Sequence, residues 1–170
     1  MVPELRHLDE VGSEVLACGV FADERPPHGT AGLVDWRLSG QVCRLMMGSY
    51  LTGKRGEVLM LPLRPKLPFD KALLFGLGCR LDFDEAVFRE VTSHMLRAME
   101  GLSARSAVVE LPGRQRGAID AERATDILLE LAVGRPEHDI WTLIETSPDQ
   151  KRITARVSEQ RRRDRRIVLG

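Results

Sequence analysis

Two glycine-rich turns with nearby arginines are the residues in this sequence best suited to bind a ligand. Each turn follows a short apolar run, as the loop at the end of a buried strand does. Backbone N–H groups in such turns can bind an anion, and arginine side chains can neutralise its charge. If the two strands are neighbours, the turns predict one anion pocket. Its residues would be Gly76, Gly78 and Arg80 from the first turn and Gly113, Arg114 and Arg116 from the second.

Other residue patterns argue against several familiar kinds of site. Gly48–Lys54 follows the phosphate-binding loop pattern as far as its lysine, but Arg55 stands where the pattern requires Ser or Thr. The histidines at positions 7, 28, 94 and 138 show no metal-ligand spacing. Cys18, Cys43 and Cys79 are far apart, which predicts reduced thiols. We therefore expect no metal, no cofactor and no catalytic residue. For the two glycine turns described above, the alternative to ligand binding is a structural role, with their arginines in contact with solvent.

The charge of the chain is balanced overall but not along its length. Lys plus Arg and Asp plus Glu both number 25, so a general attraction to nucleic acid or membranes is not expected. Residues 147–170 hold eight basic and three acidic side chains. Five of the basic ones lie close together: Arg161, Arg162, Arg163, Arg165 and Arg166. They predict either contacts with nucleic-acid phosphates or a solvated helix end. No aromatic residue lies between them to stack on bases, which favours the solvated helix end.

The apolar runs predict a layered α/β domain that positions these residues. The segment Lys71–Leu81 contains an uncharged run from Ala72 to Phe75, which is typical of a strand buried on both faces. Because strands alternate with helices, we predict an α/β fold, a three-layer α/β/α sandwich with a mostly parallel, mixed sheet of about six strands. Further strands are expected at Val2–Leu8, Glu14–Phe21, Glu57–Leu63, Ala107–Leu111 and Ile140–Ile144, and helices at Gly32–Ser49, Asp84–Glu100, Asp120–Val133 and from Ser147 to about Arg163.

The helical segments also carry signals for their ends and their buried faces. Asp84 and Asp120 occupy N-cap positions in front of amphipathic segments. Residues 1–146 are expected to form the domain, with 147–170 as a C-terminal helix and basic tail of the same domain. In Gly32–Ser49 one stripe is expected to form the apolar face. It consists of Leu33, Trp36, Gly40, Cys43 and Met47, and it is widened by Val34, Leu38, Val42 and Leu45.

No segment predicts membrane insertion or export. No apolar run approaches the roughly 20 residues that a membrane-spanning helix needs. The first ten residues include Glu4, Arg6, Asp9 and Glu10 in place of an apolar signal core. The sequence therefore predicts a cytoplasmic protein.

Several motifs, in order and spacing, resemble the N-terminal domain of the M17 leucyl aminopeptidase family. They are G-V-F at Gly19–Phe21, the run G-K-R-G-E-V-L-M-L-P that begins at Gly53, L-L-F-G-L-G at Leu73–Gly78, and Leu111-Pro112-Gly113 at a strand end. The resemblance covers roughly Val15 to Ile144 and implies a macro-domain-like fold. That family carries its two metal ions and catalytic residues in a separate C-terminal domain with an N-T-D-A-E-G-R-L stretch, which this sequence lacks. The resemblance therefore implies the fold and not the peptidase activity.

These observations lead to one leading hypothesis and two alternatives. The leading hypothesis is a non-catalytic, stand-alone relative of the aminopeptidase N-terminal domain that acts through a protein partner or through self-association as a homodimer. The first alternative is an ADP-ribose or nucleotide-binding module at the glycine turns, because macro-like folds bind ADP-ribose in that region. The second is a nucleic-acid accessory protein that uses the basic tail.

Overall fold

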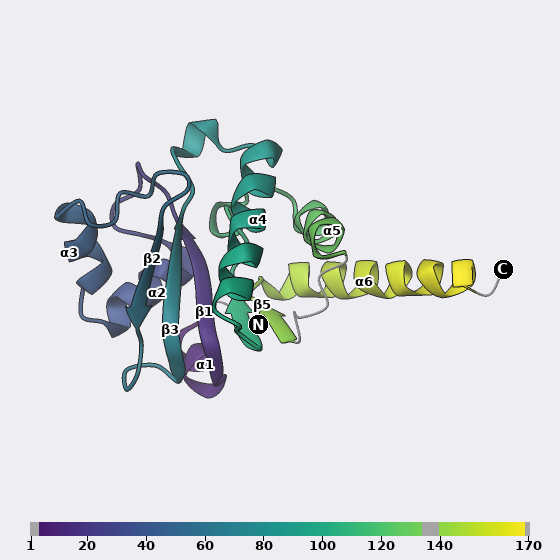
Figure 1. The fold of residues 1–170 in the computed structure, drawn as a ribbon, viewed down its shortest axis with the longest axis horizontal. Coiled ribbons are helices and arrows are strands. Elements are labelled where there is room, and N and C mark those ends of the chain that lie inside the picture. Colours follow the sequence, from purple (N-terminus) through teal and green to yellow (C-terminus); the bar gives the residue numbers. More distant parts are fainter. Residues whose placement is uncertain (1–3, 134–139, 169–170) are drawn as a thin grey trace.

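The computed structural model describes residues 4–133 and 140–168, with the backbone alone for residue 140 and residues 159–168. Helices and strands alternate along most of this part of the chain (Figure 1). The strands are β1 (Ser13–Val20), β2 (Val58–Pro62), β3 (Phe69–Gly76), β4 (Ser106–Val109) and β5 (Ile140–Leu143). The α-helices are α1 (Leu5–Glu10), α2 (Gly29–Arg37), α3 (Gln41–Met47), α4 (Glu85–Gly101), α5 (Ala121–Ala132) and α6 (Ser147–Val168), and short 3-10 turns lie at Arg80–Asp82 and Arg114–Arg116.

The five strands of the described residues form one sheet in the order β2-β3-β1-β4-β5. Strand β1 is the centre, since Leu16 pairs with Ala72 of β3 on one side and with Val108 of β4 on the other. The pairs of β1 with β3, β1 with β4 and β4 with β5 are parallel, whereas β2 is antiparallel to β3 at the edge. The carboxyl ends of β1, β3, β4 and β5 therefore meet at one edge of the sheet, which we call the carboxyl edge.

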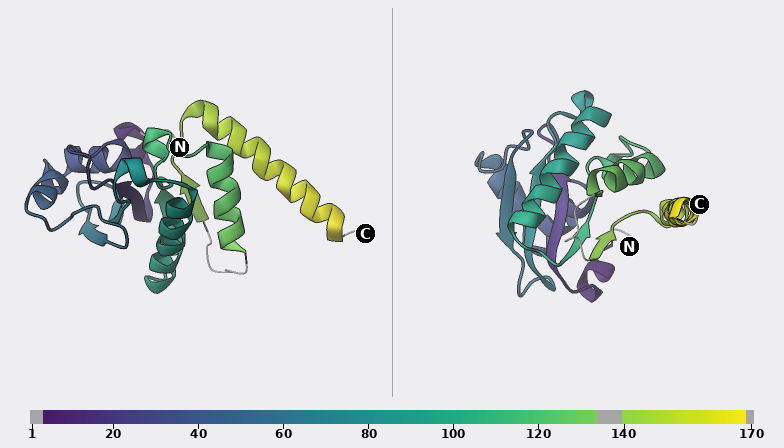
Figure 2. Two further views of the ribbon diagram at one scale, coloured as in Figure 1. Left: turned by 90° about the horizontal axis from the view of Figure 1, so that it is seen from above. Right: turned by 45° about the vertical axis from the view of Figure 1, so that its right-hand side comes forward.

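Helices cover both faces of the sheet and form the three predicted layers (Figures 1 and 2). Alternate residues of β1 point to opposite faces. Val15 and Ala17 pack in the core under α4 and α5, whereas Leu16 and Cys18 pack in the core under α1, α2 and α3. Helix α6 follows β5 in the chain, lies beside α5 and leads away from the body of the molecule (Figure 2). The predicted three-layer α/β sandwich is confirmed, with five strands in the described residues where about six were expected.

The missing strand is the first one, since Val2–Leu8 was predicted as an edge strand and that prediction is wrong. Residues 5–10 form α1 instead, and its Leu8 is fully buried in the core shared with α2 and α3. The alternation of apolar and polar residues in this segment was too short to distinguish a strand from one and a half turns of helix.

The predicted helix Gly32–Ser49 is two helices. The chain turns between α2 and α3 at Ser39 and Gly40, which both adopt positive φ values of 56° and 79°. The Asp35 carboxylate accepts the backbone N–H of Cys43 at 2.9 Å and ties the second helix to the first. The break changes the buried face: Val34 and Val42 of the widened stripe are buried as expected, whereas Trp36 and Met47 are exposed and their place in the stripe is wrong. The residues of the two helices that are buried are Thr30, Ala31, Val34, Val42 and Met46.

The predicted N-caps of the two clearest helices are confirmed. The Asp84 carboxylate accepts the N–H of Val87 at 2.8 Å, and the Asp120 carboxylate accepts the N–H of Glu122 at 3.0 Å. Both aspartates thereby satisfy N–H groups that have no partner within the first turn of a helix. The Gly134 and Pro136 expected to end the second helix, and His138, lie outside the described residues.

Ion pairs connect α6, the helix of the C-terminal segment, to α5 and its N-cap. Arg152 Nη2 on α6 lies 2.9 Å from Asp120 Oδ1 in front of α5, and Arg156 Nη2 lies 2.8 Å from Asp126 Oδ2. These ion pairs join the first half of α6 to α5. The assignment of residues 147–170 to the same domain as 1–146 stays a prediction.

Candidate functional site

The predicted glycine turns both lie at the carboxyl edge, at the ends of two strands that are not neighbours, and their joint role in binding an anion stays a prediction. Strand β1 separates their strands, so the turn after β3 and the turn after β4 flank the loop that follows β1. The N–H of Ala22 in this loop donates to the Gly78 carbonyl at 2.9 Å. Gly76 lies directly against the loop that precedes β2, since a Cβ on Gly76 would come within 1.9 Å of the Lys54 carbonyl oxygen. The condition set for a shared anion pocket, neighbouring strands, is therefore not met.

Each of the three predicted arginines has a carboxylate partner. Arg80 donates its backbone N–H and its Nε to Asp23, at 3.0 and 3.2 Å. Arg116 forms an ion pair with the buried Glu24. These contacts bind each guanidinium to an internal anion, so it has less capacity for a phosphate ligand.

Arg114 is held most firmly of the three. Its side chain is only 8% exposed. Its Nε and Nη2 donate to the two oxygens of Glu145 at 2.7 and 2.9 Å, and Nη2 also lies 2.9 Å from Asp149 Oδ2. These charges raise the pKa of Arg114 further, the hydrogen bond to Glu145 being the largest cause. The loop after β4 is therefore joined to the segment after β5 and to the first turn of α6.

Three buried glutamates that were not predicted from the sequence accompany these arginines. Glu24, Glu110 and Glu145 are 4%, 3% and 4% exposed. Glu110 accepts the hydroxyl and the backbone N–H of Thr30 at 2.9 and 3.1 Å, at the start of α2. Burial raises the pKa of Glu110 to about 7; the hydrogen bonds from Thr30 oppose this shift, and the charges of the other two glutamates add to it.

A sequence signal for two of these glutamates was present. Glu110 directly follows the apolar strand A-V-V, and Glu145 follows the apolar run W-T-L-I. A carboxylate at the carboxyl end of a buried strand is a candidate site residue by position alone. Burial of Cys18 raises the pKa of its thiol well above the ordinary value, and the charge of Glu110 adds to this shift.

Side chains fill much of the space between the loops of the carboxyl edge. The Phe83 and Phe21 rings meet edge to face with centroids 5.5 Å apart, and a Cβ on Gly113 would come within 2.6 Å of the Phe83 ring. A Cβ on Gly29 would likewise come within 2.5 Å of the Gln115 side chain. The Nε2 and Oε1 atoms of Gln115 are buried and have no hydrogen-bond partner. An anion ligand would have to displace some of these groups.

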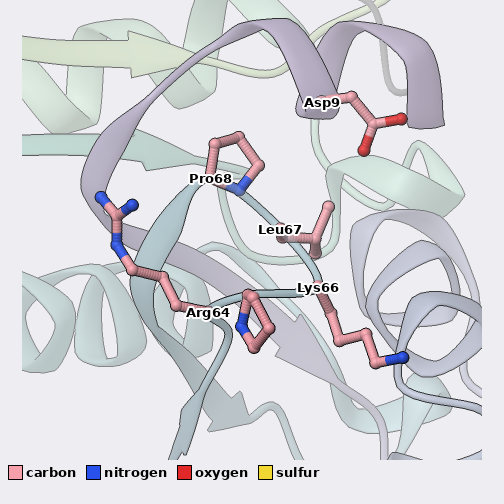
Figure 3. A pocket seen from close by; sticks show the side chains of 6 residues that line it. Asp9, Arg64, Lys66, Leu67 and Pro68 are labelled. Carbon is pink, nitrogen blue, oxygen red and sulfur yellow. The ribbon is translucent and has the colours of Figure 1, made fainter.

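Two further hollows lie in the described part of the molecule. One of about 440 Å³ is lined by Asp9 and residues 64–68. Figure 3 shows the charged ends of Asp9, Arg64 and Lys66 pointing in different directions, so they do not converge on one ligand. A smaller hollow of about 230 Å³ lies between the loop before β2 and helix α4, and its lining is Gly56, Glu90, Val91, His94 and Arg97.

Five large apolar side chains of α2, β2 and the segment from α3 to Tyr50 are exposed. Helices α2 and α3 cover one face of the sheet, whereas Val58 and Met60 are paired with strand residues buried in the core on the other face. Trp36, Met47 and Tyr50 are 69%, 72% and 76% exposed, and Met60 and Val58 on β2 are 55% and 41% exposed. We call these five residues the exposed apolar set. Trp36 and Met47 were expected in the core, so their exposure is a finding that the structure adds.

Other predicted features receive little description from the structure. The backbone of Arg161–Arg166 belongs to α6, but the side chains of Arg161, Arg162, Arg163, Arg165 and Arg166 lie outside the described residues. Within the described residues, no group of three or more His, Cys, Asp and Glu side chains is arranged to hold a metal ion. In the same part of the chain, no helix is long and apolar enough to cross a membrane.

Comparison with known proteins connects this chain to one family. Residues 17–134 match the model of the cytosol aminopeptidase family, N-terminal domain. A probable cytosol aminopeptidase of Cupriavidus metallidurans is 32% identical over 143 residues, which cover 82% of this chain and 26% of the relative. The chain spans about a quarter of the length of the curated relatives that it matches.

Solved structures show the same fold. A mutant of the tomato leucine aminopeptidase superposes with a TM-score of 0.58 at 13% identity, over 86% of this chain and 33% of that chain. The Oceanobacillus iheyensis macrodomain with ADP superposes with a TM-score of 0.69 at 13% identity, over 89% of this chain and 86% of that chain. The predicted macro-domain-like α/β fold is confirmed.

Proposed function

The chain belongs to the family of the cytosol aminopeptidase N-terminal domain, and we propose that it is a non-catalytic binding module that acts through contacts with other proteins. The relatives are named cytosol aminopeptidases, so we also place its action in the cytoplasm. Peptide hydrolysis by the relatives is not extended to these 170 residues, which match only about a quarter of each relative.

The observation that carries the proposal is the exposed apolar set. Trp, Tyr and Met are residue types enriched in protein interfaces. Trp36, Met47 and Tyr50, each more than two thirds exposed, are of these types.

The carboxyl edge supports an anion-binding function less well. A macrodomain with ADP shares the fold, which keeps an ADP-ribose or nucleotide ligand as the second candidate. Against it, Arg80, Arg114 and Arg116 are each paired with a carboxylate. The buried Glu110 adds a further acidic group to the same edge. Calorimetry with ADP-ribose tests this candidate, and we expect no heat of binding at millimolar ligand.

Site-specific photo-crosslinking in cells tests the interaction proposal. A photoreactive amino acid at Tyr50 should give one discrete crosslinked product, and Met47→Glu should abolish it because a charge in an apolar interface opposes binding. The matched control is the same amino acid at Leu81, an apolar residue that is 98% exposed at the carboxyl edge. Equal products from both positions, or none from Tyr50, would overturn the proposal. Hydrolysis of a leucyl-anilide substrate by the pure, metal-supplemented chain would overturn the non-catalytic part.

The basic tail provides a third candidate, nucleic-acid binding, whose test is a truncation. A chain that ends after Glu159 loses Arg161, Arg162, Arg163, Arg165 and Arg166. We expect the full and the truncated chain to be retained equally on DNA at low salt, because in this proposal the basic tail does not bind phosphates. Retention of the full chain alone would instead favour a nucleic-acid function, since phosphate contacts make binding strongly salt-dependent.

A further inference from the structure

The edge strand β2 has backbone groups that face away from the sheet. In the described part of the chain β2 pairs with β3 alone. The carbonyl of Glu57 accepts the N–H of Gly76, and the N–H of Leu63 donates to the carbonyl of Asp70. Since residues alternate in an antiparallel pair, residues 57, 59, 61 and 63 face β3. Val58, Met60 and Pro62 therefore direct their backbone groups outward, and only Pro62 lacks an N–H to donate.

The side chains of the same residues form an apolar strip beside α4. Val58 is paired with Phe75 and Met60 with Leu73. Phe75 and Leu73 are buried in the core under α4, whereas Val58 and Met60 remain exposed at the margin of that face. The strip thus extends a buried sheet face by one strand that α4 does not cover.

A hollow continues this strip toward α4. It is the hollow of about 230 Å³ whose lining includes Gly56, Val91 and His94. The His94 ring packs edge-on against Phe75, with centroids 5.5 Å apart, and Phe75 is the β3 partner of Val58. Strand addition derives specificity from pockets that take alternate side chains of the added strand, and this hollow is placed for that role.

Positive charge lies at both ends of β2. Lys54 and Arg55 precede the strand, and Arg64 and Lys66 follow it. Arg55 and Arg64 pair with Glu90 and Asp70 respectively. Among the described residues, Lys54 and Lys66 have no ion-pair partner and both are exposed. Each end of the edge strand therefore carries one exposed lysine that has no ion-pair partner among the described residues.

A second copy of the chain fits this edge poorly. Two copies of β2 related by a two-fold axis must pair antiparallel, and the missing N–H of Pro62 favours the register in which Val58 faces Met60 of the other copy. That register places Lys54 opposite Arg64 of the other copy. A shift of the axis to Met60 places Lys54 opposite Lys66. Like charges directly opposed across a strand pair are destabilising.

From the outward groups, the apolar strip and the charged ends, we infer that β2 binds an extended segment of another protein as an added antiparallel strand. The segment has alternating apolar residues in its centre and acidic residues on both flanks. The inference rests on the proposed interaction function and names the class of its partner. The added strand would form hydrogen bonds with Val58 and Met60, place an apolar side chain in the hollow near His94, and bring carboxylates to Lys54 and Lys66.

A designed peptide tests the inference on the full chain. The probe is a fluorescein-labelled peptide with the sequence Glu-Glu-Val-Thr-Val-Thr-Val-Glu-Glu, and the control peptide has Lys at the four flanking positions. By fluorescence anisotropy we expect the acidic probe to bind at least 10-fold more tightly than the basic control. Charge reversal of Lys54→Glu with Lys66→Glu should remove this preference, whereas Lys151→Glu on α6 should preserve it.

Amide hydrogen exchange identifies the binding groups. The acidic probe should slow the exchange of the Val58 and Met60 amides and leave the amides of α5 unchanged. Equal binding of both peptides, or unchanged exchange at Val58 and Met60, would overturn the inference. Protection of these two amides that rises with protein concentration in the absence of peptide would also overturn it, because it would identify a second copy as the occupant. Crosslinking from Tyr50 remains an independent readout of the proposed function.

Discussion

Replacement of Glu110 by Gln should change how the stability of the protein depends on pH. Glu110 is 3% exposed, and within the described part of the chain it has the hydroxyl and N–H of Thr30 as donors and no ion-pair partner. Burial raises its pKa from 4.5 to about 7. Between these two values the folded protein keeps a proton that the unfolded chain releases. The free energy of unfolding therefore falls as the pH rises through this window.

The size of the effect follows from the pKa shift. One pKa unit corresponds to about 1.4 kcal/mol, so the shift of Glu110 corresponds to about 3 kcal/mol of lost stability above pH 7. Glu110→Gln cannot ionise, and its carboxamide oxygen can still accept the Thr30 donors. We expect the unfolding free energy of the variant relative to wild type to rise by about 3 kcal/mol between pH 4.5 and pH 8.

Urea denaturation at four pH values between 4.5 and 8 measures this difference. For a chain of this length, each kcal/mol corresponds to roughly 2–4 °C in Tm, so thermal melts at pH 8 should differ by about 6–12 °C. Glu10→Gln, at an exposed glutamate of α1, is the matched control and should give a curve parallel to wild type. Parallel curves for Glu110→Gln and wild type would refute the reasoning, since they would mean that Glu110 ionises equally in the folded and unfolded states.

Further predictions concern single side chains, each measured by urea denaturation at pH 7. Asp84→Ala removes the cap on the Val87 N–H and should cost about 1 kcal/mol, and a cost near zero would contradict the capping role. Arg114→Met leaves the buried Glu145 carboxylate without its main partner and should cost about 3–5 kcal/mol. A loss under about 1 kcal/mol would contradict the assignment of that pair as a buried one. Gln115→Leu removes two buried, unpartnered polar atoms and should be neutral or stabilising by about 1 kcal/mol; a clear destabilisation would mean that this amide has partners, such as water.

Much of the fold could be predicted because its signals are local. The apolar runs of β1, β3 and β4 are continuous, as expected for strands buried between two layers of helices. Helices α4 and α5 each begin with an aspartate cap. The break at Ser39–Gly40 was missed because Gly40 fits both a helical stripe and a left-handed turn. Only the packing of Val34 and Val42 against the sheet decides between them.

The candidate site was less predictable because its partners come from distant parts of the chain. The sequence placed Arg114 and Arg116 on the correct loop, but their carboxylate partners are Glu145 and Glu24. Which strand ends lie side by side depends on the strand order, and β1 lies between the two glycine turns for that reason. The exposure of Trp36 was likewise unpredictable, since an apolar residue in a helix is more often part of a core.

The central position of β1 has a consequence for synthesis of the chain. Both neighbours of this strand are made after it, and the second, β4, ends only at Val109. At a ribosomal rate of about 5–20 residues per second, β1 waits roughly 5–20 s for that neighbour. During this interval one apolar margin of the nascent sheet lacks a partner, and such margins promote aggregation. A nascent chain stalled before Ser106 is thus the form of this protein most in need of a chaperone.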